Sequence, residues 1–337
     1  MMGKQVRMAD IAEKLGISIV SVSKALRGKE GVGEKRRAEI LRMADELGYV
    51  RNVHASGTAG FSVGILTSGR YLERGASFYW ELYERLLTHL RKGKDFGMLE
   101  VVSLEDEAQC AVPRLVLENR VQGLIVMGKL GHPYINMIAG LGIPFTMLDT
   151  YEIGMPYDTV LSAGYSGMCE MTQYLIAQGH RRLKFVGTVG ATSSITDRYF
   201  GFCRAMAEAG LPVTPDLVIP DRDANGATRI ELSPRLPETA TALVCNCDYT
   251  AYHVLKQLTV MGIRVPEEIS IVGYDNYVLS EMGSIGITTY RVDQNEMASA
   301  SADQIRRRIL SPDAGREIIT VHGEILVRES CAPVNGK

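Results

Sequence analysis

The chain has 337 residues, of which 46% are hydrophobic and 23% are charged, and its formal net charge is −2. This composition is ordinary for globular proteins and excludes collagen, coiled-coil rods and wholly disordered chains. The length predicts two or three domains. The hydrophobic runs, such as GLIVM at 123–127, are too short for a membrane-spanning helix, which needs about 18 to 20 apolar residues. We therefore expect no membrane partner.

The start of the chain, MMGKQVRMADIAEK, has no hydrophobic segment of the kind found in signal peptides. The six cysteines contain no C-x-x-C pair and form no short-chain disulfide framework. Both observations predict a cytoplasmic protein.

Positive charge is concentrated near the start of the chain. Residues 1–60 contain 11 Lys or Arg and 7 Asp or Glu, whereas the remaining residues carry a net negative charge. A basic segment attached to an acidic body is typical of a module that binds a polyanion such as DNA.

The first 50 residues are predicted to form three short helices. Met8, Ile11 and Leu15 follow the helical spacing of one apolar face. Gly16 allows the turn that ends this helix, and Ser18 can cap the next one. Two short helices around such a turn form a helix-turn-helix unit, although a three-helix bundle that binds protein remains an alternative. The predicted helices cover residues 8–15, 19–26 and 34–47.

The second of these helices carries side chains that suit DNA. Exposed apolar side chains can contact thymine methyl groups, hydroxyl groups can bind phosphates, and a lysine can bind a guanine edge. This set favours DNA binding over the protein-binding alternative. The candidate residues are Ile19, Val20 and Lys24 on the outward face, with Ser18, Ser21 and Ser23 around them.

The sequence MADIAEKLGISIVSVSKALRG, followed by VGEKRRAEILRMADELGYVRN, resembles the head of the lactose/galactose-repressor family of bacterial transcription regulators. In that family the second helix lies in the major groove of DNA. The resemblance implies that the outward apolar and basic residues face the bases and that the three serines face phosphates.

The segment after the third helix departs from the family pattern. The family has Pro-Asn there, then Ala and Leu at three-residue spacings, and its leucines wedge into the minor groove. Asn52 and Ala55 match this pattern and are implied DNA contacts, but Arg51 replaces the proline and Thr58 replaces the leucine. We predict a flexible linker over 51–61 instead of a strongly kinking hinge.

From Ser62 onward, short β-rich runs alternate with helical segments, which is typical of parallel sheets joined by right-handed crossovers. The predicted fold class is an all-α helix-turn-helix head followed by two doubly wound, parallel-sheet α/β lobes. The predicted domains are a DNA-binding head at 1–50, a linker at 51–61 and a two-lobed effector-binding and dimerisation domain at 62–330. The first lobe covers about 62–161 and 291–320, and the second about 162–290 and 321–330. The main predicted strands are 63–67, 98–103, 123–127, 145–149, 183–187, 242–245 and 269–274, and the helices are 79–91, 108–119, 167–178, 198–209 and 249–261.

Several segments of the body, including VQGLIVMG, YLIAQGHRRLKFVG and MGIRVPEEISIVGYDN, extend the family resemblance. It implies a fold like that of periplasmic sugar-binding proteins, with an effector between the lobes. Sheets of this class bind ligands beyond the carboxyl ends of their strands. On the family pattern, Arg198 and Asp275 are the main effector-binding pair. The full candidate set is Ser68, Phe78, Tyr79, Trp80, Asp149, Ser193, Arg198, Cys247, Asp248 and Asp275.

Several of these residues have a second interpretation. Arg198 is predicted to open a helix, where a cation is disfavoured, so a polar or anionic ligand accounts for it. Asp248 can instead cap the following helix, Trp80 can belong to a core between the lobes, and Asp275 can be a turn residue. Cys247 stands where the family has Asn, which removes an amide donor and acceptor. His180 is predicted at an exposed helix end.

The sequence contains none of the common motifs of enzyme active sites that we considered. The sequence has no G-x-x-x-x-G-K or G-x-G-x-x-G at a strand end, no G-x-S-x-G, and no Cys or His pair with zinc spacing. We predict no cofactor, no metal and no enzyme activity. The predicted function is a ligand-responsive repressor of carbohydrate-utilisation genes, a homodimer that binds double-stranded operator DNA and a sugar or sugar derivative. A sugar-binding protein without a regulatory role is the alternative.

Overall fold

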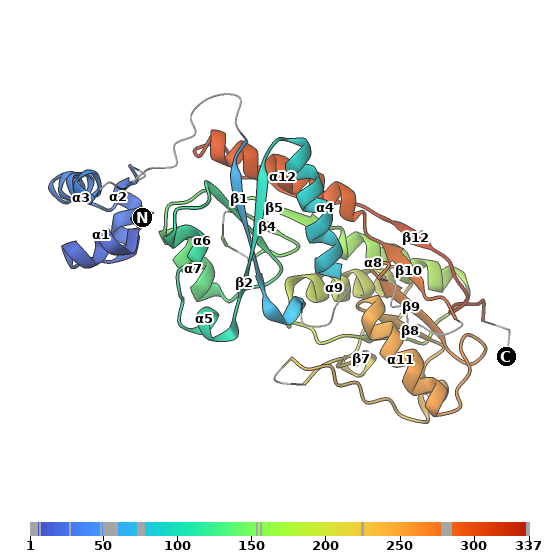
Figure 1. Cartoon of the computed structure of the whole chain (residues 1–337). Helices are drawn as coiled ribbons and strands as arrows, with labels where there is room; N and C mark the ends of the chain where they lie inside the picture. Colours follow the sequence, from blue (N-terminus) through green and yellow to red (C-terminus); the bar gives the residue numbers. More distant parts are fainter. Residues whose placement is uncertain are drawn as a thin grey trace. The chain divides into compact units, whose positions relative to one another are not determined.

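The computed structural model describes residues 6, 8–26, 28–47, 49, 60–72, 78–152, 154–155, 157–223, 226–277 and 285–334. The chain forms two compact units, each made of separate segments. The first unit comprises Met1–Gly75, Tyr79–Val160 and Met297–Ile318, and the second comprises Ala76–Phe78, Leu161–Glu296 and Ile319–Lys337. Figure 1 shows the helices and strands of both units in sequence colours.

The head of the first unit has the predicted helices α1 (Met8–Leu15), α2 (Ile19–Leu26) and α3 (Glu34–Leu47). Gly16 takes the left-handed conformation at φ +62° in the turn between α1 and α2. Ser18 caps α2, because its Oγ accepts a hydrogen bond from the Ser21 amide at 3.2 Å. The prediction of a helix-turn-helix head is confirmed.

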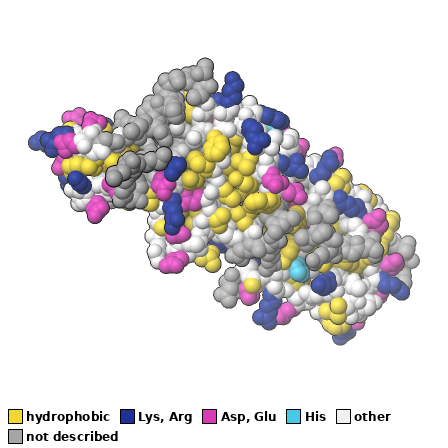
Figure 2. All heavy atoms as spheres, viewed as in Figure 1, with side chains coloured by type: hydrophobic (Ala, Val, Ile, Leu, Met, Phe, Trp, Pro, Cys, Tyr) yellow, Lys and Arg dark blue, Asp and Glu magenta, His cyan; other side chains and the backbone are white. Residues whose placement is uncertain are grey.

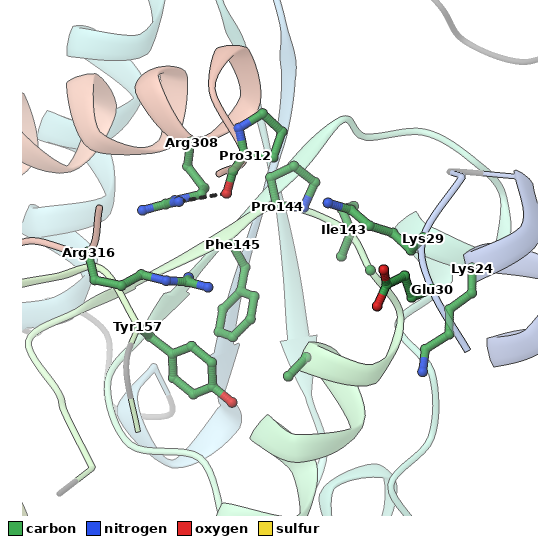
Figure 3. Close-up of a pocket in the computed structure, with 12 residues that line it drawn as sticks. Lys24, Lys29, Glu30, Ile143, Pro144, Phe145, Tyr157, Arg308, Pro312 and Arg316 are labelled. Atoms are coloured by element: carbon green, nitrogen blue, oxygen red, sulfur yellow. Dashed lines mark hydrogen bonds between the residues drawn. The ribbon is translucent and has the colours of Figure 1, made fainter. Parts of the chain in front are cut away.

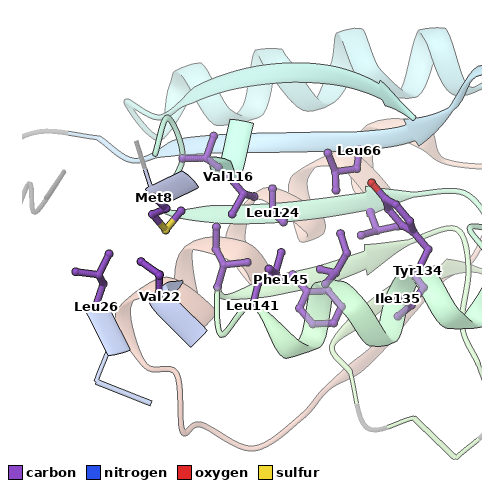
Figure 4. Close-up of a cluster of buried hydrophobic side chains, with 14 of the residues drawn as sticks. Met8, Val22, Leu26, Leu66, Val116, Leu124, Tyr134, Ile135, Leu141 and Phe145 are labelled. Atoms are coloured by element: carbon purple, nitrogen blue, oxygen red, sulfur yellow. The ribbon is translucent and has the colours of Figure 1, made fainter. Parts of the chain in front are cut away.

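A hydrophobic cluster joins the head to the α/β part of the first unit. Met8, Val22 and Leu26 of the head and Leu124 and Leu141 of the α/β part belong to it, as Figure 4 shows. All five side chains are buried, so the cluster gives the small head apolar contacts that three short helices lack on their own.

The first sheet contains six strands among the described residues, in the order β11-β5-β4-β3-β1-β2. The pairs β1–β2, β1–β3, β3–β4 and β4–β5 are parallel. Strand β2 lies at one edge. The strands are β1 (Ser62–Ser68), β2 (Phe96–Val102), β3 (Gly123–Met127), β4 (Phe145–Leu148), β5 (Thr159–Ser162) and β11 (Ile318–Val321).

The second sheet also contains six strands among the described residues, in the order β12-β10-β9-β8-β6-β7. Its strands pair in parallel except β12, which is antiparallel to β10. Two mainly parallel sheets joined through helices confirm the predicted fold class. The strands are β6 (Leu183–Val186), β7 (Val218–Ile219), β8 (Ala242–Cys245), β9 (Ser270–Tyr274), β10 (Thr288–Arg291) and β12 (Glu324–Leu326).

Helices connect the strands of both sheets. None of those in the described part of the chain is long and apolar enough to cross a membrane. The helices are η1 (Gly69–Tyr71), α4 (Phe78–Lys92), α5 (Leu104–Ala108), α6 (Arg114–Leu117), α7 (His132–Gly140), α8 (Gly164–Ala177), α9 (Ser193–Glu208), η2 (Pro215–Leu217), α10 (Leu236–Thr239), α11 (Asp248–Val260) and α12 (Gln294–Leu310).

Two helix predictions were wrong. The segment predicted as one helix over 108–119 is interrupted between α5 and α6, because Cys110 is left-handed at φ +51° and Pro113 cannot continue a helix. Arg198 does not open a helix, since α9 already begins at Ser193. Thr192 caps that helix, and its side chain accepts a hydrogen bond from the Ile195 amide at 3.1 Å.

Candidate functional site

The predicted DNA-reading helix α2 packs partly against the rest of the first unit. Ile19 and Val20 are half-buried beside the hydrophobic cluster. Ser23 is fully buried, and its Oγ donates a hydrogen bond of 2.5 Å to the Leu141 carbonyl oxygen. The expectation that Ser23 is exposed was therefore wrong for this structure, because α2 turns this serine toward the end of α7.

The other predicted DNA contacts keep some exposure. The hydroxyl groups of Ser18 and Ser21 lie 2.9 Å apart at the exposed start of α2. Lys24 is half-buried. Asn52 and Ala55 lie outside the described residues, so their roles in DNA binding stay predictions.

Three predicted effector residues lie at the carboxyl ends of the first sheet. Ser68 ends β1, Asp149 follows β4, and the Tyr79 hydroxyl from α4 donates a 2.8 Å hydrogen bond to the Asp149 carboxylate. The ring of Tyr71 lies 4.6 Å from the ring of Tyr79, centre to centre. This edge therefore offers a carboxylate beside two aromatic rings.

Arg70 also belongs to this edge and was not predicted. Its Nε donates to Ser68 Oγ at 2.9 Å, and its guanidinium bonds Glu107 at 2.7 Å. Glu107 also accepts a hydrogen bond from the Gly131 amide. The only sequence signal for Arg70 was its position just after a strand end. The ion pair orients its guanidinium beside Ser68.

The two other aromatic candidates begin α4. Phe78 is half-buried, and Trp80 is 40% exposed with its ring centre 5.6 Å from that of Tyr83. Trp80 is therefore not part of the core of the first unit, and its alternative place between the lobes stays a prediction.

Arg198 lies at the carboxyl edge of the second sheet and is 6% exposed. Its guanidinium carbon is 3.9 Å from the centre of the Tyr274 ring, and its NH1 donates to the Asn246 carbonyl oxygen at 2.8 Å. Tyr274 ends β9 and Asn246 follows β8. These contacts hold the charge at the ligand-binding edge of this sheet class.

The Cys247 thiol is affected by the charges of two other candidate residues of the second unit, Asp275 and Arg198. Burial and the negative charge of Asp275 raise the pKa of the Cys247 thiol to about 12, while the positive charge of Arg198 lowers it. Both charges therefore lie near this sulfur. The neutral thiol, 3.4 Å from Thr250 Oγ1, makes this position far less polar than an amide would.

Asp248 is the first residue of α11 and is almost fully buried. It does not cap the helix, since Cys247 holds that position, so the capping interpretation was wrong. Its Oδ1 has no hydrogen-bond partner among the described residues, and a side chain at Gly273 would collide with it. Burial and nearby Asp275 raise the pKa of Asp248 well above its usual range, which favours the neutral acid.

Asp275 follows β9 in the left-handed conformation, at φ +93°. Its carboxylate accepts a hydrogen bond of 3.1 Å from the Tyr277 amide. Ser193 begins the helix that carries Arg198 and is half-buried.

A buried network beside these residues was missed. Asp221 accepts two hydrogen bonds from Arg222, at 2.9 and 2.6 Å, one from Asn246 at 2.8 Å and one from the Thr188 amide at 2.8 Å. Burial alone would raise the pKa of Asp221, but these donors hold it at about 2. Because Asn246 also bonds Arg198, the network links two arginines at one sheet edge.

The prediction for His180 was wrong. Its side chain is buried, with Nδ1 3.0 Å from Thr241 Oγ1 and Nε2 3.1 Å from the Ala332 carbonyl oxygen. The left-handed turn at Gly179 ends α8 and directs His180 inward. Burial lowers the pKa of this histidine.

Among the described residues, no group of three or more His, Cys, Asp or Glu side chains is arranged to hold a metal ion. The described polar clusters are suited to hydrogen bonding with a ligand.

Two family models match the chain. "Bacterial regulatory proteins, lacI family" matches residues 7–52, which include the head, and "Periplasmic binding protein-like domain" matches residues 172–331. Together they account for the helix-turn-helix head and for most of the second unit.

Similar proteins extend along the whole chain. The HTH-type transcriptional regulator DegA of Bacillus subtilis (strain 168) is 25% identical over 334 residues, which are 97% of this chain and 98% of that protein. The HTH-type transcriptional repressor PurR of Pasteurella multocida (strain Pm70) is also 25% identical over 334 residues, 95% of this chain and 97% of that protein.

Solved structures share the fold at lower identity. A complex of the transcriptional regulator CelR with cellobiose has a TM-score of 0.66 at 20% identity, covering 97% of this chain and all of that one. The lac repressor dimer bound to operator and the anti-inducer ONPF has a TM-score of 0.65 at 19% identity, covering 98% of this chain and all of that one.

Proposed function

The chain belongs to the lacI family of bacterial regulatory proteins, and we propose that it represses carbohydrate-utilisation genes as an effector-responsive homodimer. As a member of this family it is a DNA-binding transcriptional regulator, not an enzyme.

The observation that carries the proposed effector class is the chemistry of the two polar clusters. In the first unit, the Asp149 carboxylate accepts a hydrogen bond from the Tyr79 hydroxyl, and in the second unit, the Arg198 guanidinium lies over the ring of Tyr274, the residue before Asp275. Carboxylates accept hydrogen bonds from sugar hydroxyls, and aromatic faces cover the apolar faces of sugar rings. Similar regulators whose structures contain cellobiose or ribose support a sugar or sugar derivative.

The proposed DNA contacts are those of α2. Ile19, Val20 and Lys24 would read base pairs, while Ser18 and Ser21 would bind phosphates. Lysine supplies the positive charge that a DNA interface needs. Ser23 can join them only when its hydrogen bond to the Leu141 carbonyl is released.

The proposed homodimer would form at the edge of the first sheet. Phe96 and Val101 of the edge strand β2 are 65% and 48% exposed. Figure 2 shows hydrophobic side chains gathered on this face of the first unit. An uncovered apolar edge strand is a surface that proteins normally pair or protect. A second copy of the chain would cover it, and light scattering of Phe96→Glu should show the monomer.

The experiment that tests this function screens a sugar panel by thermal shift and then measures DNA binding with each hit. The DNA is the region upstream of the gene for this chain, with a scrambled fragment as control. A hit that stabilises the protein and changes the affinity for the upstream fragment supports the proposal. A hit that binds without changing DNA affinity would favour a sugar-binding protein without a regulatory role.

A further inference from the structure

A cavity of about 350 Å³ lies within the first unit, between the segment that follows α2 and the α/β part. This volume lies within the range of small-molecule sites. Figure 3 shows its lining, with lysines from one side and aromatic and arginine side chains from the other. The lining residues are Lys24, Lys29, Glu30, Ala139, Gly142, Ile143, Pro144, Phe145, Tyr157, Arg308, Pro312 and Arg316.

The cavity has an excess of positive charge. Lys24, Lys29 and Arg316 form no ion pair with any described residue, and Glu30 is the one unpaired carboxylate in the lining. The charge of Arg308 is already balanced, since its Nε donates a hydrogen bond of 2.5 Å to the buried Asp158 carboxylate. A ligand with two negative charges would balance the remaining charge.

The wall opposite the lysines is aromatic. The rings of Phe145 and Tyr157 lie 4.6 Å apart, centre to centre, and both line the cavity. In Figure 3 the Arg316 guanidinium points toward these rings. A flat ring placed there would gain stacking contacts, while its charged group could reach the lysines.

The cavity adjoins the predicted DNA-reading surface. Lys24 belongs to α2, and the neighbouring Ser23 is held by the Leu141 carbonyl at 2.5 Å. A ligand that binds Lys24 and Lys29 together with Arg316 would hold α2 in this arrangement. The same lysine could not then contact a base pair.

We propose that this cavity binds a phosphate monoester carried on a flat ring, and that this ligand holds the head against the α/β part and off DNA. Lysines bind phosphates as point charges, and an arginine adds directional donors. By linkage, ligand and DNA must weaken each other's binding to the same extent. Ligand binding in the cavity does not depend on the proposed DNA-binding function. Only the effect of the ligand on DNA binding rests on that function.

The test uses the full chain and three probes, which are adenosine monophosphate, ribose 5-phosphate and adenosine. Calorimetry without DNA should show adenosine monophosphate binding at one site per chain. Ribose 5-phosphate should bind about tenfold more weakly because it lacks the flat ring, and adenosine should not bind measurably. Saturating adenosine monophosphate should raise the Kd for the upstream DNA fragment about tenfold.

Variants locate the site. Arg316→Gln and Tyr157→Leu should each weaken adenosine monophosphate binding about tenfold. Arg114→Gln, an exposed arginine of α6 outside the cavity lining, should bind it as the wild type does. Circular dichroism confirms that each variant is folded before binding is measured.

The two parts fail in different ways. Absence of calorimetric binding, equal binding of adenosine, or unchanged binding by both cavity variants overturns the site. Binding that leaves DNA affinity unchanged overturns the regulatory part. If the chain binds no DNA at all, the proposed function fails, while the calorimetry still decides whether the cavity binds a phosphate monoester.

Discussion

Arg198 and Tyr274 form a cation–π contact, with 3.9 Å between the guanidinium carbon and the ring centre. Tyr274 is fully buried and ends β9, whereas Arg198 comes from α9. Arg198 also donates a hydrogen bond to the carbonyl oxygen of Asn246, which directly follows β8. One side chain therefore joins a helix to two strand ends, and these contacts within the chain fix its orientation.

Replacing Arg198 by Lys should weaken effector binding at least about tenfold, because an ammonium group lacks the planar face and the fork of donors. The free energy of unfolding should fall by about 1–2 kcal/mol, from the lost cation–π contact and hydrogen bond. Calorimetry with a sugar hit and thermal unfolding measure the two effects. Arg204→Lys is the matched control on the same helix, where the side chain is exposed and pairs with Glu208. Equal effector affinity in the two variants would remove Arg198 from the site.

Asp275→Asn should abolish the effector's influence on DNA binding while leaving effector-free DNA affinity nearly unchanged. Asparagine tolerates the positive φ of this position, so the backbone should not be strained as it would be by alanine. The amide keeps the shape of the carboxylate but loses its charge and one acceptor. DNA titrations with and without the sugar hit measure this effect. A variant that responds like the wild type would show that the Asp275 charge is not needed.

Lys24→Ala should cost about 1–3 kcal/mol of DNA binding and relax specificity at one base pair. The reason is that a lysine on the reading helix can donate to a guanine edge. Titrations against a set of single base-pair operator variants measure this change, with the exposed Arg42→Ala in α3 as control. A uniform loss across all operator variants would instead make Lys24 a phosphate contact.

His180 should make stability depend on pH below its ordinary pKa. Because burial lowers its folded pKa, protonation favours the unfolded chain. The stability contributed by the neutral ring is present above about pH 6.5 and is lost as the pH falls toward the folded pKa, by up to about 1.4 kcal/mol per pH unit. The unfolding free energy of His180→Gln should fall less steeply between pH 7 and 5. His322→Gln, at an exposed position, serves as the matched control variant. Identical slopes for wild type and His180→Gln would contradict this assignment.

Arg308→Met should destabilise the first unit by about 3–5 kcal/mol, because it leaves the buried Asp158 carboxylate without its ionic partner. Arg308 also donates to the carbonyl oxygens of Pro312, Ala314 and Gly315, which fold the loop after α12. Denaturant unfolding measures the loss, and Arg307→Met, at a more exposed pair, should cost less. Equal losses in the two variants would show that burial of the pair is not decisive.

The strongest periodic signals in the sequence predicted the structure well. The head helices at 8–15, 19–26 and 34–47 and the apolar strands at 123–127 and 242–245 match the observed bounds. These segments have a single apolar face or a continuous apolar run, so local pattern and burial agree. The short strands β5, β10, β11 and β12 were missed, because three or four mixed residues carry no clear period.

The candidate sites were predicted only in part. Tyr79 and Asp149 were both predicted as effector residues, and a hydrogen bond joins them in the structure. Arg198 and Asp275 were predicted as a pair on the family resemblance, and their role in effector binding stays a prediction. The Asp221–Arg222 pair was missed, since it follows a strand of two residues and its partner Asn246 is distant in sequence. Burial of such polar groups depends on tertiary packing, which spacing along the chain does not encode.

The segmented first unit also affects the order of events during synthesis. Strand β11 belongs to the first sheet and most of helix α12 belongs to the first unit, yet both are translated after the strands β6 to β10 of the second sheet. While the ribosome makes those strands, Asp158 lacks Arg308, and β5 has one unpaired edge. The nascent first unit must therefore stay soluble with an open sheet edge and an unneutralised carboxylate. A polypeptide that ends before residue 308 would lack Arg308, strand β11 of the first sheet and strand β12 of the second.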